Sequence, residues 1–145
     1  MDEVVILAVD PGTTTGFCAA DNDGTLLFAD QYPRQEFCTW YYETAMSQGP
    51  ELHTIVERFT ITQRTITLSR EGSGDALGII GMVRWASLYF CERDIIFQQP
   101  DEVMRLVTNQ RLKDLGWYVP KEHARDTLRH LAVRCAKLGL LRIPT

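Results

Sequence analysis

Two acidic residues stand in apolar surroundings, where a lone charge needs an explanation. Asp10 ends an apolar run at residues 4–9 and is followed by a proline-glycine turn. Glu57 lies within the apolar strand sequence LHTIVERFT, and Arg58 beside it points to the opposite face because side chains alternate along a strand. A buried carboxylate needs a partner, and a bound cation is one such partner. The pattern is typical of a metal site, although a turn aspartate and a surface-facing glutamate remain open.

A third acidic residue lies on the last predicted helix, at residues 120–138. His123, Asp126 and His130 recur at i, i+3 and i+7, so they share one face of that helix. Carboxylate oxygens with one imidazole suit Mg²⁺ or Mn²⁺ better than zinc. A solvated polar face explains the same spacing. The metal interpretation therefore requires the three acidic residues to meet at one edge of a sheet.

Periodicity and turn signals predict a single α/β domain over residues 1–145. Three β-prone runs joined by tight turns favour an antiparallel meander, and two later strands that follow helices favour parallel pairing. The expected fold is a mixed five-stranded sheet flanked by helices. The predicted strands are residues 4–9, 14–20, 25–32, 52–60 and 94–99, and the predicted helices are residues 34–47, 76–91, 101–107 and 120–138, with irregular segments at 60–75 and 108–119.

The composition is that of an ordinary soluble globular protein, with 45% hydrophobic and 23% charged residues. No secretory signal is expected at the start. The longest apolar stretch, residues 76–91, contains Arg84 and is shorter than a membrane span of roughly 20 residues. The absence of a CxxC pair disfavours zinc and favours reduced thiols in a cytoplasmic protein. The cysteines concerned are Cys18, Cys38, Cys91 and Cys135.

Charge is distributed unevenly along the chain, whose formal net charge is −4. Residues 1–56 contain nine acidic residues and one basic residue, a net −8, whereas residues 105–145 contain nine basic and three acidic residues, a net +6. A basic last quarter permits a nucleic-acid surface, although solvated surface bases explain it equally well. The candidate phosphate contacts follow the Glu57 strand or precede the last helix, and are Arg58, Arg64, Arg70, Arg105, Arg111, Lys113 and Lys121.

Four motifs, in order AVDPGTTTG, TIVERF, GIIGMVRWA and KEHARDTLRH, resemble the RuvC family of Holliday-junction resolvases, especially its short phage-type members, within the ribonuclease-H-like superfamily. The resemblance spans nearly the whole chain. It implies an endonuclease that cuts Holliday junctions and other branched DNA by two-metal hydrolysis, leaving 5′ phosphate and 3′ hydroxyl ends. It further implies two Mg²⁺ or Mn²⁺ ions per site, held by Asp10, Glu57, His123 and Asp126.

The same resemblance suggests contacts with DNA and with a second subunit. Gly12 and Gly16 would bring backbone close to a substrate phosphate, and Phe59 is the candidate for the aromatic residue that the family places near the junction centre. The predicted helix at residues 76–91 is apolar on nearly every side, which favours an interface. The matching helix forms the homodimer in the family, so the predicted interface consists of Ile79, Ile80 and Val83.

Other functions share parts of this pattern. The DPGTTTG turn is also similar to the phosphate loop of actin-like and sugar-kinase-type ATPases, although that fold needs two such domains and no second glycine-rich loop follows in the sequence. A ribosomal-RNA-processing nuclease of the same fold is a further alternative. A non-catalytic DNA-binding remnant is disfavoured by the complete set of carboxylates.

Overall fold

The computed structural model describes residues 4–58 and 70–145, and it contains the predicted mixed sheet. The order of the strands is β3-β2-β1-β4-β5. The first three strands pair antiparallel, whereas β4 pairs parallel to β1 and β5 pairs parallel to β4. The prediction of three antiparallel strands followed by two parallel ones is confirmed. The strands are β1 (Val5–Asp10), β2 (Thr14–Ala20), β3 (Leu26–Pro33), β4 (Leu52–Glu57) and β5 (Ile96–Gln98).

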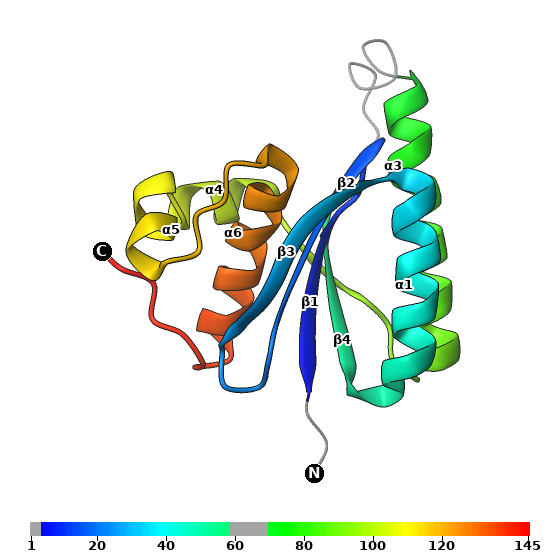
Figure 1. Ribbon diagram of the computed structural model, residues 1–145, viewed down its shortest axis with the longest axis horizontal. Coiled ribbons are helices and arrows are strands. Elements are labelled where there is room, and N and C mark those ends of the chain that lie inside the picture. Colours follow the sequence, from blue (N-terminus) through cyan, green and yellow to red (C-terminus); the bar gives the residue numbers. More distant parts are fainter. Residues whose placement is uncertain (1–3, 59–69) are drawn as a thin grey trace.

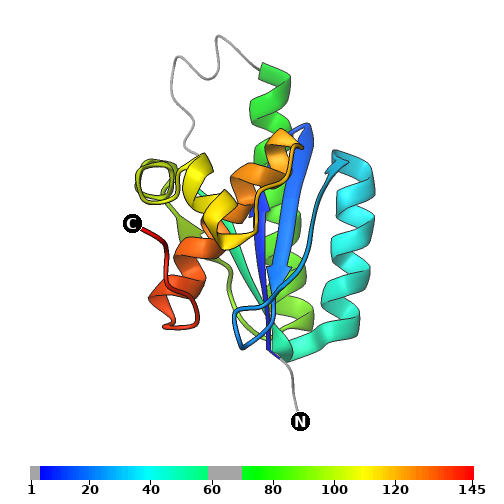
Figure 2. The ribbon, with the colours of Figure 1, turned by 60° about the vertical axis from the view of Figure 1, so that its left-hand side comes forward.

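Helices cover both faces of the sheet (Figure 1). The long helices α1 and α3 lie side by side on one face, and α6 packs on the other, with α4 and α5 beside it on the side away from the sheet (Figure 2). A short 3₁₀ turn, η1, joins α1 to β4. The helices are α1 (Arg34–Gln48), α3 (Arg70–Phe90), α4 (Pro100–Leu106), α5 (Asn109–Leu115) and α6 (Glu122–Lys137), and η1 is Gly49–Glu51.

The central strand β1 is buried on both faces, which explains its unbroken apolar sequence. Ile6 and Ala8 belong to the core beneath α6, whereas Leu7 and Val9 belong to the core beneath α1 and α3. Side chains alternate along a strand, so Asp10, which follows Val9, points to the α6 face like Ile6 and Ala8. The carboxyl end of β1 therefore presents its charged side chain toward α6.

Parallel pairing brings three strand ends to one edge of the sheet. Val9 pairs with Val56, and Glu57 pairs with Gln98. Glu57 and Gln98 follow residues that face α3, so both point to the α6 face, the face to which Asp10 also points. Arg58 lies one residue beyond Glu57 and lines a hollow with residues of α3, which confirms that it faces the opposite way.

The hairpin between β2 and β3 follows its sequence signal. Asp21 accepts hydrogen bonds at its carboxylate from the backbone N–H groups of Asp23 and Thr25, at 2.9 and 3.0 Å. Gly24 adopts φ of +80°, which a residue with a side chain rarely does. The Asp-Asn-Asp-Gly sequence at residues 21–24 thus forms the tight turn expected between the second and third strands.

Three predicted elements differ from the structure. Helix α3 begins at Arg70, whereas residues 70–75 were expected to be irregular. Asp75 anchors the first turns of this helix. The Asp75 carboxylate accepts a hydrogen bond from Thr13 Oγ1 at 3.0 Å and forms an ion pair with Arg34 at 2.6 Å. Helix α5 lies in a segment expected to be irregular. Its signals were present in the sequence, with Thr108 as N-cap and Gly116 in the left-handed conformation that ends the helix. Strand β5 has three residues rather than six.

The residues of α3 predicted to form a dimer interface do not lie on its exposed side. Ile79 and Val83 are fully buried in the core beneath α1 and α3, and Ile80 is partly buried against it. A side chain that already packs on its own sheet is not available to a second subunit, so Ile79 and Val83 are corrected from interface to core.

Within the described part of the chain, no helix has both the length and the apolar character needed to cross a membrane.

Candidate active site

Asp10 and Glu57 meet at the edge of the sheet where β1 and β4 end. Burial, a hydrogen bond with Glu57 and the negative charges of Glu57 and Asp126 raise the pKa of Asp10 to about 9. Burial also opposes ionisation of Glu57, but contacts with His130 and with Asp10 outweigh it and lower the pKa of Glu57 to about 2. The two carboxyl groups therefore share one proton at neutral pH, carried by Asp10.

Asp126 reaches this edge because α6 begins in contact with the sheet. A Cβ atom at Gly16 would collide with the backbone carbonyl of His123, so only glycine allows this approach. On β3, the side-chain oxygen of Gln31 accepts from the backbone N–H groups of His123 and Ala124, at 3.1 and 3.4 Å. These donors belong to the first turn of α6, which has no partner within the helix. Gly16 and Gln31 thus fix the start of α6, and with it Asp126.

The carboxylate of Asp126 is tied to a buried cation of its own helix. Arg129 is 5% exposed and pairs with Asp126 at 2.7 Å. The same guanidinium donates to the Val107 carbonyl at 2.9 Å and to the side-chain oxygen of Asn109. Burial raises the pKa of Asp126, Arg129 opposes that shift, and the charge of Glu57 reinforces it. Arg129 therefore offsets part of the negative charge that three neighbouring carboxylates would otherwise carry.

His130 contacts Glu57 from α6, a role that sequence reasoning did not assign to it. Its ring is 3% exposed, and its Nε2 lies 3.6 Å from Glu57 Oε1, a close electrostatic contact somewhat longer than a hydrogen bond. Gln98 on β5 donates from its side-chain nitrogen to the His130 carbonyl, at 2.9 Å, and the same nitrogen lies 3.3 Å from His130 Nδ1. The sequence signal was the i, i+7 spacing that places His130 on the face of His123.

The structure brings three of the four predicted ligands, Asp10, Glu57 and Asp126, close enough to interact electrostatically. The imidazole of His123 forms no hydrogen bond or ion pair with Asp10, Glu57 or Asp126, and its role as a ligand stays a prediction. Among the described residues, no three His, Cys, Asp or Glu side chains are arranged to hold a metal ion directly. In this arrangement Asp10 and Glu57 are hydrogen-bonded to each other, and one oxygen of Asp126 is paired with Arg129.

The chemistry of this donor set nevertheless fits a hard divalent cation. Burial, the hydrogen bond with Glu57 and the negative charges of Glu57 and Asp126 together keep a proton on Asp10. A divalent ion with oxygen ligands would replace that proton. Asp10, Glu57 and Asp126 would hold it.

The predicted DNA contacts are spread over several elements. Arg58 is exposed at the sheet edge, with its backbone N–H bonded to the Gln98 carbonyl at 2.8 Å. Lys121, directly before α6, pairs with Asp30 at 2.8 Å, and Lys113 lies 4.8 Å above the ring of Tyr118. Arg111 donates to the Leu106 carbonyl at 2.8 Å. Phe59, Arg64 and the side chain of Arg70 lie outside the described residues.

A hollow of about 320 Å³ adjoins this edge on the α3 face of the sheet. Its lining residues are Arg58, Leu77, Ile80 and Phe97. Gly12 lies in the turn after β1, and its N–H is 3.4 Å from Thr15 Oγ1, while Thr15 donates back to the Gly12 carbonyl at 2.9 Å. This turn is therefore closed by its own hydrogen bonds beside Asp10.

Neither known family models nor curated protein sequences match this chain. A solved structure does: T. thermophilus RuvC in complex with a Holliday junction substrate is similar over 97% of this chain and 99% of that one, with a TM-score of 0.59 and 19% sequence identity. Likeness at this identity establishes the fold. The chain has the ribonuclease-H-like fold of RuvC, with Asp10, Glu57 and Asp126 at the edge where its parallel strands end.

Proposed function

We propose that this protein is a metal-dependent endonuclease that cuts Holliday junctions and related branched DNA. The observation that carries the proposal is the cluster of Asp10, Glu57 and Asp126, which perturb one another's ionisation at the sheet edge of a RuvC-like fold. A carboxylate cluster of this kind is expensive unless it serves a cation. The fold, which matches over nearly the full length of both chains, favours a nuclease over an actin-like ATPase.

Mg²⁺ or Mn²⁺ bound to these carboxylates, as a pair of ions, would supply an activated water and charge stabilisation at a phosphodiester. The chain's own residues perform the other tasks. Asp10 would release its proton to solvent when a cation binds, and Arg129 holds one oxygen of Asp126 in place. His123, at the first turn of α6, is proposed as a further ligand. The expected products carry a 5′ phosphate and a 3′ hydroxyl.

DNA would approach the sheet edge past basic residues that flank the carboxylates. Arg58 directly follows β4 on one side of this edge, and Lys121 directly precedes α6 on the other side. The ion pair of Lys121 with Asp30 is exposed on both partners, so a phosphate can compete for it at little cost. Each phosphate neutralised adds salt-dependent affinity. These bases explain how a chain of net charge −4 can bind a polyanion.

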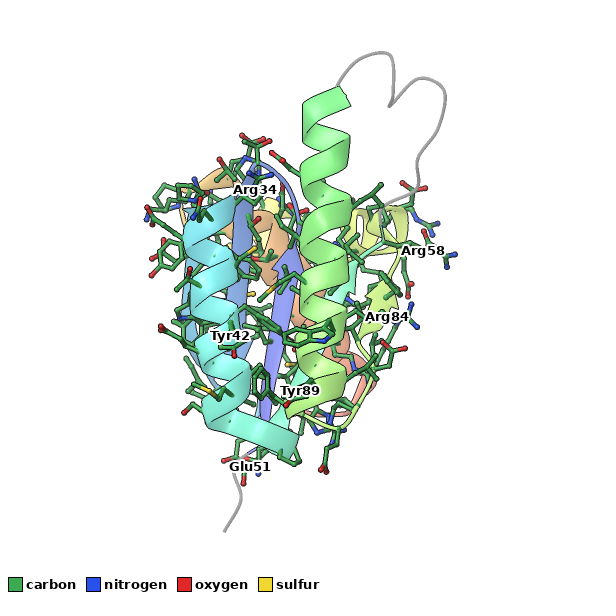
Figure 3. All side chains as sticks on the ribbon, turned by 90° about the vertical axis from the view of Figure 1, so that its right-hand side faces the viewer. Arg34, Tyr42, Glu51, Arg58, Arg84 and Tyr89 are labelled. Carbon is green, nitrogen blue, oxygen red and sulfur yellow. The ribbon has the colours of Figure 1, made fainter. Side chains whose placement is uncertain are left out.

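A homodimer is proposed through the outer surface of α1 and α3. Tyr42, Trp85 and Tyr89 stack there in succession, with ring centroids 6.3 and 5.4 Å apart and planes 13° apart at each step. Figure 3 looks onto this face, with Tyr42 on α1 and Tyr89 near the end of α3. Trp85 is 52% exposed and Leu88 is 50% exposed. Large apolar side chains gathered on a surface mark an interaction site, and a two-fold pair would give one active site for each of two DNA strands.

The test of the function uses a labelled four-way junction, a linear duplex of the same sequence, and RNA, each with Mg²⁺, Mn²⁺ or EDTA. We expect metal-dependent cleavage of the junction alone, and nicks that a DNA ligase reseals without further treatment, because the ends are a 5′ phosphate and a 3′ hydroxyl. Asp10→Asn should abolish cleavage and leave junction binding intact. Asp23→Asn, in the exposed β2–β3 turn, is the matched control. Cleavage in EDTA, or by Asp10→Asn at the wild-type rate, would show that the carboxylate cluster is not the active site.

The dimer is tested by sedimentation. Trp85→Asp and Leu88→Asp should increase the monomer fraction, because each would place an unpaired charge in the interface. Both side chains are half-exposed, so the fold tolerates the change, whereas the same substitution at the buried Val83 would unfold the core. Unchanged sedimentation of both variants would place the interface elsewhere or leave the protein a monomer.

A further inference from the structure

Gln98 and His130 form a buried pair behind Glu57, on the side away from Asp10. His130 is 3% exposed and Gln98 is 5% exposed, and the two residues come from α6 and β5. Polar side chains buried to this extent are held in place by specific partners. A neighbour with a proposed role in catalysis is Glu57, whose Oε1 lies 3.6 Å from His130 Nε2.

The orientation of the Gln98 amide follows from its contact with the helix backbone. Its side-chain nitrogen lies 2.9 Å from the carbonyl oxygen of His130, which can only accept a hydrogen bond. The reverse orientation would place two acceptor oxygens against each other. The Gln98 side-chain oxygen has no partner among the described residues, so the nitrogen alone fixes this amide.

That orientation determines which ring nitrogen of a neutral His130 carries the proton. The same Gln98 nitrogen lies 3.3 Å from His130 Nδ1, so Nδ1 faces a donor and must accept. A neutral imidazole then carries its proton on Nε2. Nε2 is the atom that faces Glu57 Oε1. The ring therefore presents an N–H group to the carboxylate.

From these contacts we infer that Gln98 and His130 are positioning residues, which fix the orientation of the Glu57 carboxylate. The inference rests on the proposed function, since it gives Glu57 its task as a ligand. The outer partners of a metal ligand fix its orientation, and their loss lowers metal affinity by about 10–100-fold. Gln98 acts one step farther away, by selecting the His130 tautomer.

The first measurement is made on the metal-free wild-type protein and needs no variant. Long-range ¹H–¹⁵N correlation spectra, recorded where the ring is neutral, report which imidazole nitrogen carries the proton. We expect His130 to carry it on Nε2, and Gln98→Met, which keeps the volume but removes the donor, to give a mixture of tautomers. His53→Gln identifies the signals of a histidine at the far end of β4. A wild-type His130 ring with its proton on Nδ1 would overturn the inference.

The second measurement is Mn²⁺ binding by calorimetry. His130→Leu and Gln98→Met should weaken binding by about 10–100-fold. His130→Gln should retain most of the affinity, because its amide nitrogen can donate from the position of Nε2, and His53→Gln should retain all of it. Equal Mn²⁺ affinity of wild type and a folded His130→Leu would refute the role of His130. Junction cleavage by the wild type tests the proposed function separately, so a failure of either idea can be recognised.

Discussion

The proton shared by Asp10 and Glu57 predicts how the stability of the metal-free protein depends on pH. The pKa of Asp10 is about 9 in the folded chain and 3.8 for an ordinary aspartate. Between these values the folded state binds one proton more than the unfolded state. The free energy of unfolding therefore falls as pH rises through this window, and the loss is complete once pH exceeds the folded pKa.

One proton corresponds to about 1.4 kcal/mol per pH unit. Between about pH 6 and about pH 8 the wild type should lose about 3 kcal/mol relative to a variant that lacks this group. Asp10→Asn is that variant, because an amide donates to Glu57 at every pH and cannot ionise. Glu57 is charged throughout this range in the wild type, so it adds no slope of its own.

The assay is urea unfolding in EDTA at several pH values, followed by tryptophan fluorescence. The difference in free energy of unfolding between the wild type and Asp10→Asn isolates the contribution of Asp10. The pH profile of Asp23→Asn should remain parallel to that of the wild type. Mn²⁺ should remove most of the difference at pH 8, because it replaces the proton. Parallel pH profiles of the wild type and Asp10→Asn in EDTA would refute the shared proton, and with it the electrostatic argument for a cation site.

Further predictions concern the residues around the carboxylates. Gly16→Ala should destabilise the protein by about 1–3 kcal/mol or more in urea, because its Cβ collides with the His123 carbonyl, and it should impair cleavage by displacing α6; wild-type stability would contradict this. Arg129→Gln should cost about 1.5–3 kcal/mol, the value of a charged hydrogen bond, since its partner Asp126 is partly exposed; unaltered unfolding would show that the ion pair adds nothing. His123→Ala should weaken Mn²⁺ binding in calorimetry, and unchanged affinity would remove His123 from the metal site.

Much of the fold follows from local sequence. The apolar run at residues 4–9 and the tight turns between the first three strands are short-range signals, and the connections indicated that these strands pair antiparallel and the last two parallel. Asp10 and Glu57 were identifiable for the same reason. A charge inside an apolar strand, or at its end, is visible without knowledge of the tertiary structure.

The sequence left undecided which side of each helix faces the sheet and at what height. For α3, apolar residues on nearly every side gave no inward face, and packing beside α1 on the sheet decided that Ile79 and Val83 are core. For α6, His123 and His130 share a face but are separated by about 10 Å along the axis. Which of them contacts Glu57 depends on where the helix crosses the sheet. That crossing is set by the close approach at Gly16 and by Gln31, contacts between segments about 90–110 residues apart, and it brings His130 to Glu57. Spacing along one helix could not contain that information, because the position of the helix is fixed by residues outside it.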